Sequence, residues 1–290
     1  MGNWTPAVGW KRIARDTWKD AGEDNLSLVA AGVAFYAFLA FVPLLTALVL
    51  CYGLFADRLT VARDILSLAE ILPASAFAIV ADQLQAMTQG SDARTGLALV
   101  VSLGVAVYGA SKAADAIMTA LNIVYEVKEC RGFVGRLLAA LGMTAGAVFL
   151  LLLAVATVSA LSFLESLLPG LGGVTAVFLR LLFIAGAGLI VMLLLALVYR
   201  FVPCRPGAAW RWITPGSVLA TLVWLAGTAG FGLYVANFGN YNATYGSLGA
   251  VIAFLTWLYL TAYIILLGGE LNAILEIDGA KRPRRAAKAA

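Results

Sequence analysis

Residues Tyr234–Ile277 read YVANFGNYNATYGSLGAVIAFLTWLYLTAYIILLGGELNAILEI, and this stretch decides the fold. It begins with a short uncharged loop that is rich in Asn and Tyr. An apolar run of about 24 residues follows, which is long enough to cross the hydrocarbon core of a bilayer. One carboxylate, Glu270, lies near the end of that run, between a Gly pair and an Asn. Because a charge is costly at such a depth, Glu270 is a candidate functional residue.

The composition of the whole chain agrees with a membrane protein. Of the 290 residues, 62% are hydrophobic and only 12% are charged, whereas soluble domains carry about 25% charged residues. The chain has no His, and it therefore lacks the commonest metal ligand and the commonest general base. We expect an all-α integral membrane protein that is not an enzyme and holds no metal or cofactor. Cys51, Cys130 and Cys204 show neither zinc spacing nor a disulfide framework, which favours unpaired thiols.

Apolar runs predict six transmembrane helices within residues 26–276, over about 26–55, 96–123, 137–163, 174–202, 214–237 and 245–276. Pro43 is expected to kink the first helix, and Pro215 falls in the first turn of the fifth, where Pro is tolerated. Residues 1–25 place Trp and basic residues at helical spacing, which predicts an amphipathic helix at the membrane interface. Residues 57–94 mix charged and apolar residues, which predicts two amphipathic helices in the first external loop. Residues 277–290 form a basic tail.

The distribution of Lys and Arg predicts the orientation of these helices. Most basic residues fall in the two termini and in the two loops on the same side as the termini: Lys11, Arg12, Arg15, Lys19, Lys128, Arg131, Arg136, Arg200, Arg205, Arg211, Lys281, Arg282, Arg284, Arg285 and Lys288. The other side carries Arg58, Arg63, Arg94 and Arg180. Both termini are therefore expected in the cytoplasm, and the Asn/Tyr loop outside. The basic tail is expected to attract anionic lipid headgroups.

Polar residues at helical spacing predict which helix faces avoid lipid. The clearest stripe is on the second predicted helix, where Lys112 and Asp115 are close enough in sequence to pair. Similar stripes place the first, second, fifth and sixth helices inside the bundle and the third and fourth nearer its edge. The candidate residues of a substrate path are Tyr36, Pro43, Tyr108, Lys112, Asp115, Thr119, Asn122, Tyr125, Tyr241, Tyr245, Tyr263, Glu270 and Asn272. The stripes fit a polar cavity and fit hydrogen-bonded helix packing equally well.

Helix geometry also predicts which of these residues lie near Glu270. The second and sixth helices run in the same direction, and each residue advances an upright helix by about 1.5 Å. Counted from the outer ends of their helices, Glu270 lies deeper than Lys112. Asn122 and Tyr125 are therefore better placed as its neighbours.

Several motifs together resemble the YihY/virulence factor BrkB family of bacterial inner-membrane proteins, whose members once carried the label ribonuclease BN. The resemblance covers about residues 26–276. Its motifs are Ala34-Phe35-Tyr36 with Pro43-Leu44-Leu45, Ala120-Leu121-Asn122 with Tyr125 and Arg131, Tyr199-Arg200-Phe201 with Pro203, Pro215-Gly216, Tyr241-Asn242-Ala243-Thr244-Tyr245-Gly246-Ser247-Leu248-Gly249, and Gly269-Glu270-Leu271-Asn272. The resemblance implies six transmembrane helices with cytoplasmic termini. It also implies a candidate transporter, since some members are linked to serum resistance or to the export of envelope lipids. Lys112 departs from the family pattern.

Two functions remain open at this point. The first is a multi-pass inner-membrane transporter or flippase that moves a small solute or an envelope lipid. It would work without ATP hydrolysis, because no Walker-type phosphate loop is present. The alternative is a structural or scaffolding protein of the cell envelope without transport activity. A metal-dependent ribonuclease needs clustered His and Asp, and a chain without His does not supply them. Acidic residues nearly balance the basic N-terminal segment, so no nucleic-acid partner is expected. The oligomeric state is not indicated.

Overall fold

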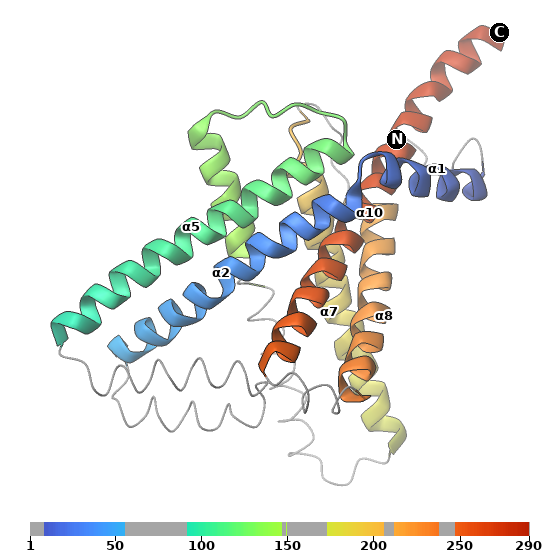
Figure 1. Cartoon of the computed structure of the whole chain (residues 1–290). Coiled ribbons are helices and arrows are strands. Elements are labelled where there is room, and N and C mark those ends of the chain that lie inside the picture. Colours follow the sequence, from blue (N-terminus) through green and yellow to red (C-terminus); the bar gives the residue numbers. More distant parts are fainter. Residues whose placement is uncertain are drawn as a thin grey trace. The chain divides into compact units, whose positions relative to one another are not determined.

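The computed structural model of the chain describes residues 9–55, 92–146, 149, 173–205, 212–237 and 247–289. Every regular element within these residues is an α-helix, as the composition predicts. The helices are α1 (Trp10–Glu23), α2 (Leu26–Phe55), α5 (Asp92–Val124), α7 (Gly173–Phe201), α8 (Pro215–Asn237) and α10 (Ser247–Ala289), with a shorter helix over Phe133–Gly146 (Figure 1). They belong to two compact units. Unit 1 holds Met1–Ala30, Ile117–Gly227 and Thr261–Ala290, and unit 2 holds Ala31–Ala116 and Thr228–Leu260.

The helix bounds follow the predicted spans closely. The bounds of α2 are those predicted, and α7 and α8 each begin within one residue of the prediction. By contrast, α10 continues through the predicted tail to Ala289. The amphipathic segment at 57–94, the second half of the third predicted span, and Tyr241 and Tyr245 lie largely or wholly outside the described residues.

Three of the described helices are long and apolar enough to cross a membrane: Val177–Phe201, Pro215–Tyr234 and Val251–Ile277. A fourth is added if α1 and the first half of α2, which meet at a bend of 64°, count as one broken span. The chain is therefore a helical membrane protein. The total of six spans and the cytoplasmic termini stay predictions.

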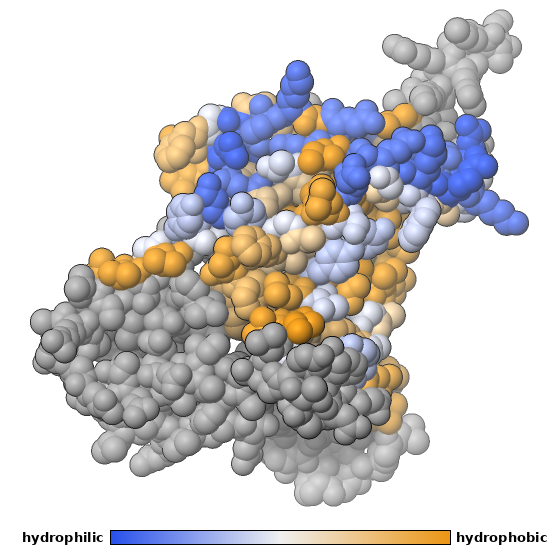
Figure 2. Space-filling view, viewed as in Figure 1, coloured by the Kyte–Doolittle hydropathy of each residue, from blue (hydrophilic) through white to orange (hydrophobic). Residues whose placement is uncertain are grey.

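Helix α1 is amphipathic, as its sequence predicts. Its buried residues, Ile13, Thr17 and Ala21, are four residues apart and so share one face. Ile13 packs in one apolar cluster with Leu271 and two neighbours on α10. The opposite face is charged, and Figure 2 shows hydrophilic residues along α1. The buried face of α1 is thus covered by α10, and the position of α1 at the membrane interface stays a prediction.

A tight turn joins α1 to α2. Asn25 adopts a left-handed conformation with φ 52°, which Asn tolerates better than most residues. The Asp24 N–H donates to the Asp20 carbonyl at 2.8 Å, and the Asn25 N–H donates to the Gly22 carbonyl. These bonds satisfy the last carbonyl groups of α1, so the helix ends there and the chain changes direction.

In unit 2, α2 packs closely against α5 and also contacts α10. A Cβ atom placed on Gly109 of α5 would lie 2.9 Å from the Cα of Ala40, so the two helices touch through their smallest residues. Farther along α2, the ring of Phe41 lies 4.6 Å from that of Phe254 on α10. Small residues therefore set the spacing on one side of α2, and aromatic rings fill it on the other.

Candidate functional site

The candidate site lies in unit 1, where α8 and α10 touch backbone to backbone. A Cβ atom on Gly216 of α8 would overlap the carbonyl oxygen of Gly268 on α10. A Cβ on Gly268 would lie 2.7 Å from the Gly216 oxygen and 2.5 Å from the Tyr199 hydroxyl of α7. Only Gly leaves room for such a contact. It holds the next turn of α10, which carries Glu270 and Asn272, against the start of α8.

Asn272 joins α10 to the first turn of α8. Its side chain is only 1% exposed. Its Oδ1 accepts a hydrogen bond of 2.8 Å from the Gly216 N–H, and its Nδ2 donates one of 3.0 Å to the Thr214 hydroxyl. Thr214 also caps α8, because it exchanges backbone-to-hydroxyl bonds of 3.1 Å with Ser217. One amide side chain thus satisfies two polar groups at a buried helix start.

Glu270 lies two residues before Asn272, on the same buried segment. It is 3% exposed, and its Oε2 atom makes no hydrogen bond to any residue that the structure describes. The charged groups that act on it most strongly are Asp24, Asp20 and Glu126, and all three are acidic. Glu270 is thus a buried carboxylate, and none of the charged groups that act on it most strongly is a cation. This arrangement costs free energy and needs a functional reason.

A cluster of Tyr125, Arg205, Tyr199 and Glu276 lies beside this carboxylate. The Arg205 guanidinium is 3.8 Å from the centre of the Tyr125 ring, pairs with Glu276, and donates a bond of 2.6 Å to the Tyr199 carbonyl. The Tyr199 hydroxyl donates to the Ile265 carbonyl at 2.7 Å. Arg205 is therefore held by partners other than Glu270.

The Tyr125 hydroxyl is a second polar group without a partner. It lies near the Asn272 amide, but the geometry makes no hydrogen bond to any described residue. Burial raises the pKa of Tyr125 well above its ordinary value, and the nearby Arg205 lowers it only in part. Tyr125 is therefore a neutral hydroxyl group near neutral pH.

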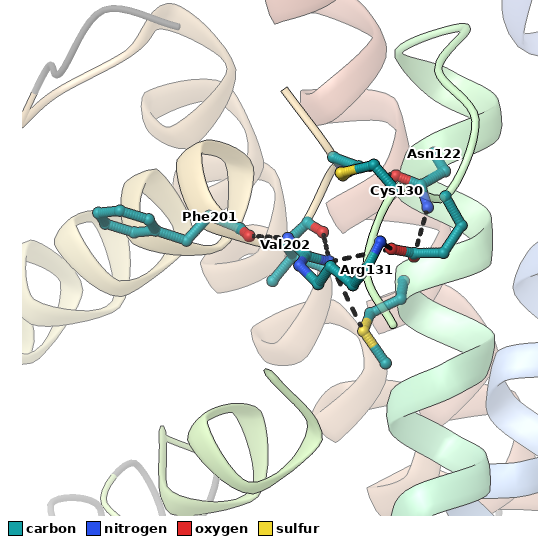
Figure 3. The surroundings of a disulfide bond; sticks show 8 residues. Asn122, Cys130, Arg131, Phe201 and Val202 are labelled. Carbon is teal, nitrogen blue, oxygen red and sulfur yellow. Dashed lines mark hydrogen bonds and ion pairs between the residues drawn. A yellow bond between two sulfur atoms is a disulfide. The ribbon is translucent and has the colours of Figure 1, made fainter. Parts of the chain in front are cut away.

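Arg131 ties the loop after α5 to the end of α7 (Figure 3). Its guanidinium donates to the carbonyl oxygens of Val202, at 2.8 Å, and of Phe201. The neighbouring Glu129 accepts hydrogen bonds from the Arg131 N–H at 2.9 Å and from the Asn122 amide at 3.0 Å. Partial burial raises the pKa of Glu129, but these bonds and the charge of Arg131 outweigh it, and the net pKa lies below its ordinary value. Asn122 continues the network, since its Oδ1 accepts the Cys204 N–H at 2.9 Å.

The expectation of three unpaired thiols is wrong for two of them. Cys130 and Cys204 form a disulfide that joins the loop after α5 to the segment after α7. The pairing could not be read from their separation of 74 residues, because only the fold brings the two segments together. Cys130, Cys204 and Glu129 are also the one group of three ligand-type residues whose donor atoms converge within the described part of the chain.

The structure brings together only part of the predicted substrate path. Asn122, Tyr125, Glu270 and Asn272 all lie in unit 1, where Tyr125 is near Asn272 and Glu270 and Asn122 bonds to Glu129 and Cys204. Of the residues in unit 2, Tyr108 is 65% exposed, Lys112 lies over its ring at 5.6 Å, and Tyr36 is also exposed. Of the other predicted residues, Asp115 and Tyr263 are half-buried and Thr119 is exposed. Pro43 lies within α2, and Tyr241 and Tyr245 are outside the described residues.

Sequence reasoning missed several members of the site. Tyr199 is 1% exposed and anchors α7 to α10, although the fourth predicted helix showed no polar stripe and was expected near the edge. Its polar neighbour is the Ile265 backbone, which no side-chain pattern reveals. Gly268 forms the α8–α10 contact, whereas Gly142 has open space around it. A Gly shows where a helix contact is allowed but does not show which helix makes it.

Known proteins resemble this chain over most of its length. It is 32% identical over 217 residues to the ribonuclease-like protein YfkH of Bacillus subtilis (strain 168), which covers 73% of this chain and 77% of YfkH. It is 28% identical over 274 residues to a UPF0761 membrane protein of Ralstonia nicotianae, and 29% identical over 259 residues to one of Rhodospirillum centenum. These alignments cover 92% and 87% of this chain but only 59% and 54% of the two relatives. No solved structure matches the chain.

A family model covers the whole of the site described above. The model described as Virulence factor BrkB matches residues 17–290. This range contains the turn after α1, the Asn122–Arg131 loop, the start of α8 and the buried segment of α10. The membrane-protein relatives agree with the apolar helices, and several of the motifs that suggested the family, among them Pro215-Gly216 and Gly269-Glu270-Leu271-Asn272, lie at the contacts of unit 1. The chain therefore belongs to the BrkB virulence-factor family of membrane proteins.

Proposed function

We propose that this chain transports a small solute or an envelope lipid across the bacterial inner membrane, without ATP hydrolysis of its own. The path passes Glu270 and Asn272 on α10 and Tyr125 after α5. The basic end of α10 lies at the cytoplasmic surface, near anionic lipid headgroups. The single observation that carries the proposal is the burial of Glu270 within an apolar helix while its Oε2 atom has no partner among the described residues.

Other carboxylates of the same unit show what a structural role looks like. Glu276 pairs with Arg205, and Glu129 is bonded to Arg131 and Asn122. Each of them fastens one segment to another. Glu270 is the most buried of these three acids, and burying a charge costs several kcal/mol unless it is paired. A carboxylate kept at this cost without a structural bond to its Oε2 is typical of an ion or substrate path.

The surroundings of Glu270 suit a transport site because they are rigid. The Gly216–Gly268 contact and the two hydrogen bonds of Asn272 fix the backbone on either side of the carboxylate. The Tyr125 hydroxyl adds a neutral group that can donate and accept hydrogen bonds. A ligand would thus meet a carboxylate and an amide from the middle of α10 and a hydroxyl from the end of α5, beside the start of α8. This set binds polar headgroups and hydroxylated or cationic solutes.

Reconstitution into liposomes tests the proposal in two arms. In the first arm, the vesicles carry fluorescent phosphatidylglycerol, and its movement between leaflets is followed by chemical bleaching from outside. In the second arm, vesicles are incubated in an extract of bacterial small molecules, and their contents are measured by mass spectrometry. We expect wild-type protein to be active in one arm and Glu270→Gln to lose most of that activity.

The matched control is Glu23→Gln, which makes the same chemical change on the exposed face of α1. Glu23 forms a surface ion pair with Lys19 and also acts on the partly exposed Asp20 and Asp24, but it does not act on Glu270 among the groups that do so most strongly, and such surface interactions contribute little. The control is expected to behave as wild type. If wild-type protein moves neither lipid nor solute, the transport proposal is wrong and a scaffolding role is favoured. If Glu270→Gln transports as well as Glu23→Gln, transport occurs elsewhere in the chain.

A further inference from the structure

Four carboxylates in unit 1 form a graded series from solvent to the protein interior. Glu126, at the end of α5, is exposed; Asp24 and Asp20, at the end of α1, are half-buried; and Glu270 is almost fully buried. Asp24, Asp20 and Glu126 all act electrostatically on Glu270. Two separate parts of the chain, the end of α1 and the end of α5, therefore bring acidic groups near one buried carboxylate whose Oε2 is unpartnered among the described residues.

The cationic groups near this series do not pair with Glu270: Lys19 acts on Asp20 and pairs with Glu23. From the segment after α7, Arg205 is held by Glu276, the Tyr199 carbonyl and the Tyr125 ring. Tyr199 donates its hydroxyl to Ile265. The residues of α8 in unit 1 carry no ionisable side chain. Burial raises the pKa of Asp24, and repulsion from Glu126 and Asp20 raises it further. Glu270 therefore has acidic neighbours and no cationic partner for its Oε2 among the described residues.

The spacing of these carboxylates favours a proton over a metal ion. A metal ion needs several oxygens at about 2.0–2.6 Å from one point. Within the described residues, the one group of three ligand-type side chains with atoms within 4.8 Å of one another is Glu129, Cys130 and Cys204. The four carboxylates are thus close enough to repel one another but too far apart to chelate. A proton needs only one oxygen at a time.

We propose that Glu270 is the proton-binding residue that couples transport to the proton gradient, with Asp24, Asp20 and Glu126 as the route by which protons reach it. The inference rests on the proposed function. Glu270 Oε2 takes up one proton from the acidic route and becomes a neutral carboxyl group, which removes the cost of a buried charge. Release of the same proton restores the carboxylate, so that each cycle transfers one proton and forms no covalent bond.

Infrared spectroscopy tests proton binding without requiring transport. The full chain in lipid nanodiscs is titrated with pH, and the C=O band of protonated carboxyl groups is followed. Near neutral pH, exposed carboxyl groups are already ionised. We expect wild-type protein and Glu23→Gln to keep a titrating band of one carboxyl per chain, and Glu270→Gln to lose it. In Asp24→Asn, which removes a repelling charge, the band should disappear at a lower pH than in wild type.

Transport in liposomes gives the second readout. An imposed gradient of one pH unit supports about tenfold accumulation when one proton moves with each substrate. Wild type should show this response, and Glu270→Gln should lose it, while Glu23→Gln keeps it. A missing infrared band, or wild-type transport that is indifferent to the gradient, overturns the proton inference and leaves the transport proposal standing. If the infrared band depends on Glu270 but wild-type protein transports nothing, Glu270 binds a proton, while the proposed transport function and its coupling to the proton gradient are both wrong.

Discussion

Gly268 is the residue at which the arrangement of unit 1 can be tested most directly. In Gly268→Ala the new Cβ would lie 2.5 Å from the Tyr199 hydroxyl, 2.7 Å from the Gly216 carbonyl oxygen and 2.8 Å from the Cβ of Ala220. Two of these neighbours cannot rotate away, because one belongs to the backbone and the other is a short side chain. The Tyr199 hydroxyl is itself held by the Ile265 carbonyl. Helices α8 and α10 must therefore move apart.

The size of the effect follows from three contributions. Overpacking a tight contact costs about 1–3 kcal/mol. Separation of the helices also weakens the bond from the Gly216 N–H to Asn272, and a buried donor left unpaired costs about 1–3 kcal/mol. The better helix propensity of Ala offsets about 1 kcal/mol of this. Central values give a net loss of roughly 3 kcal/mol, which lowers the Tm of a chain of this size by roughly 5 °C.

Tryptophan fluorescence during heating in detergent measures this change. All variants are heated at one scan rate, because membrane proteins often unfold irreversibly and the apparent Tm then depends on rate. The matched control is Gly227→Ala on α8, whose Cβ would meet only the Ile264 side chain at an ordinary 3.6 Å. We expect the control to equal or slightly exceed wild type. A Tm for Gly268→Ala as high as that of Gly227→Ala would show that α8 and α10 do not touch at Gly268.

Three further predictions concern the loop after α5. Arg131→Lys loses the forked donors that bind the end of α7. We expect its free energy of unfolding to fall by about 1–3 kcal/mol and its Tm to fall accordingly, whereas the Tm of the exposed control Arg12→Lys should equal that of wild type. Because the folded pKa of Glu129 lies below its ordinary value of 4.5, its stabilisation is present above that pH and is lost on acidification. From about pH 6 to about pH 4, the Tm of wild type should therefore fall more than that of Glu129→Gln. Reducing agent should destabilise wild type by about 2–4 kcal/mol and leave Cys204→Ser unchanged; equal responses would contradict the disulfide.

The helices could be predicted from the sequence because their signals are local. The apolar run from Leu26 ends where α2 ends, and Pro215 opens α8 with Thr214 as its cap. These patterns depend on hydropathy and backbone chemistry within a few residues. The end of α10 was missed, because a basic tail after a membrane span can be disordered or helical with the same composition.

The candidate site could be predicted only in part. Glu270 stood out because charge is rare in an apolar run, and helix geometry placed Asn122 and Tyr125 near it. The contacts of Tyr199, Arg205 and Gly268 depend on which helices meet, and this is a property of the whole fold. Backbone carbonyl groups accept many of these bonds, and they leave no trace in a side-chain pattern.

The Cys130–Cys204 disulfide also serves as an internal reporter of membrane orientation. The charge distribution predicts that both cysteines face the cytoplasm, where the glutathione and thioredoxin systems keep thiols reduced. In growing cells the pair should then react with an alkylating reagent that crosses membranes and resist one that does not. A pair found oxidised in living cells would place these loops in the periplasm, and with them the N-terminus and the end of α10. A single redox measurement would thus decide the direction in which every helix of the chain is threaded.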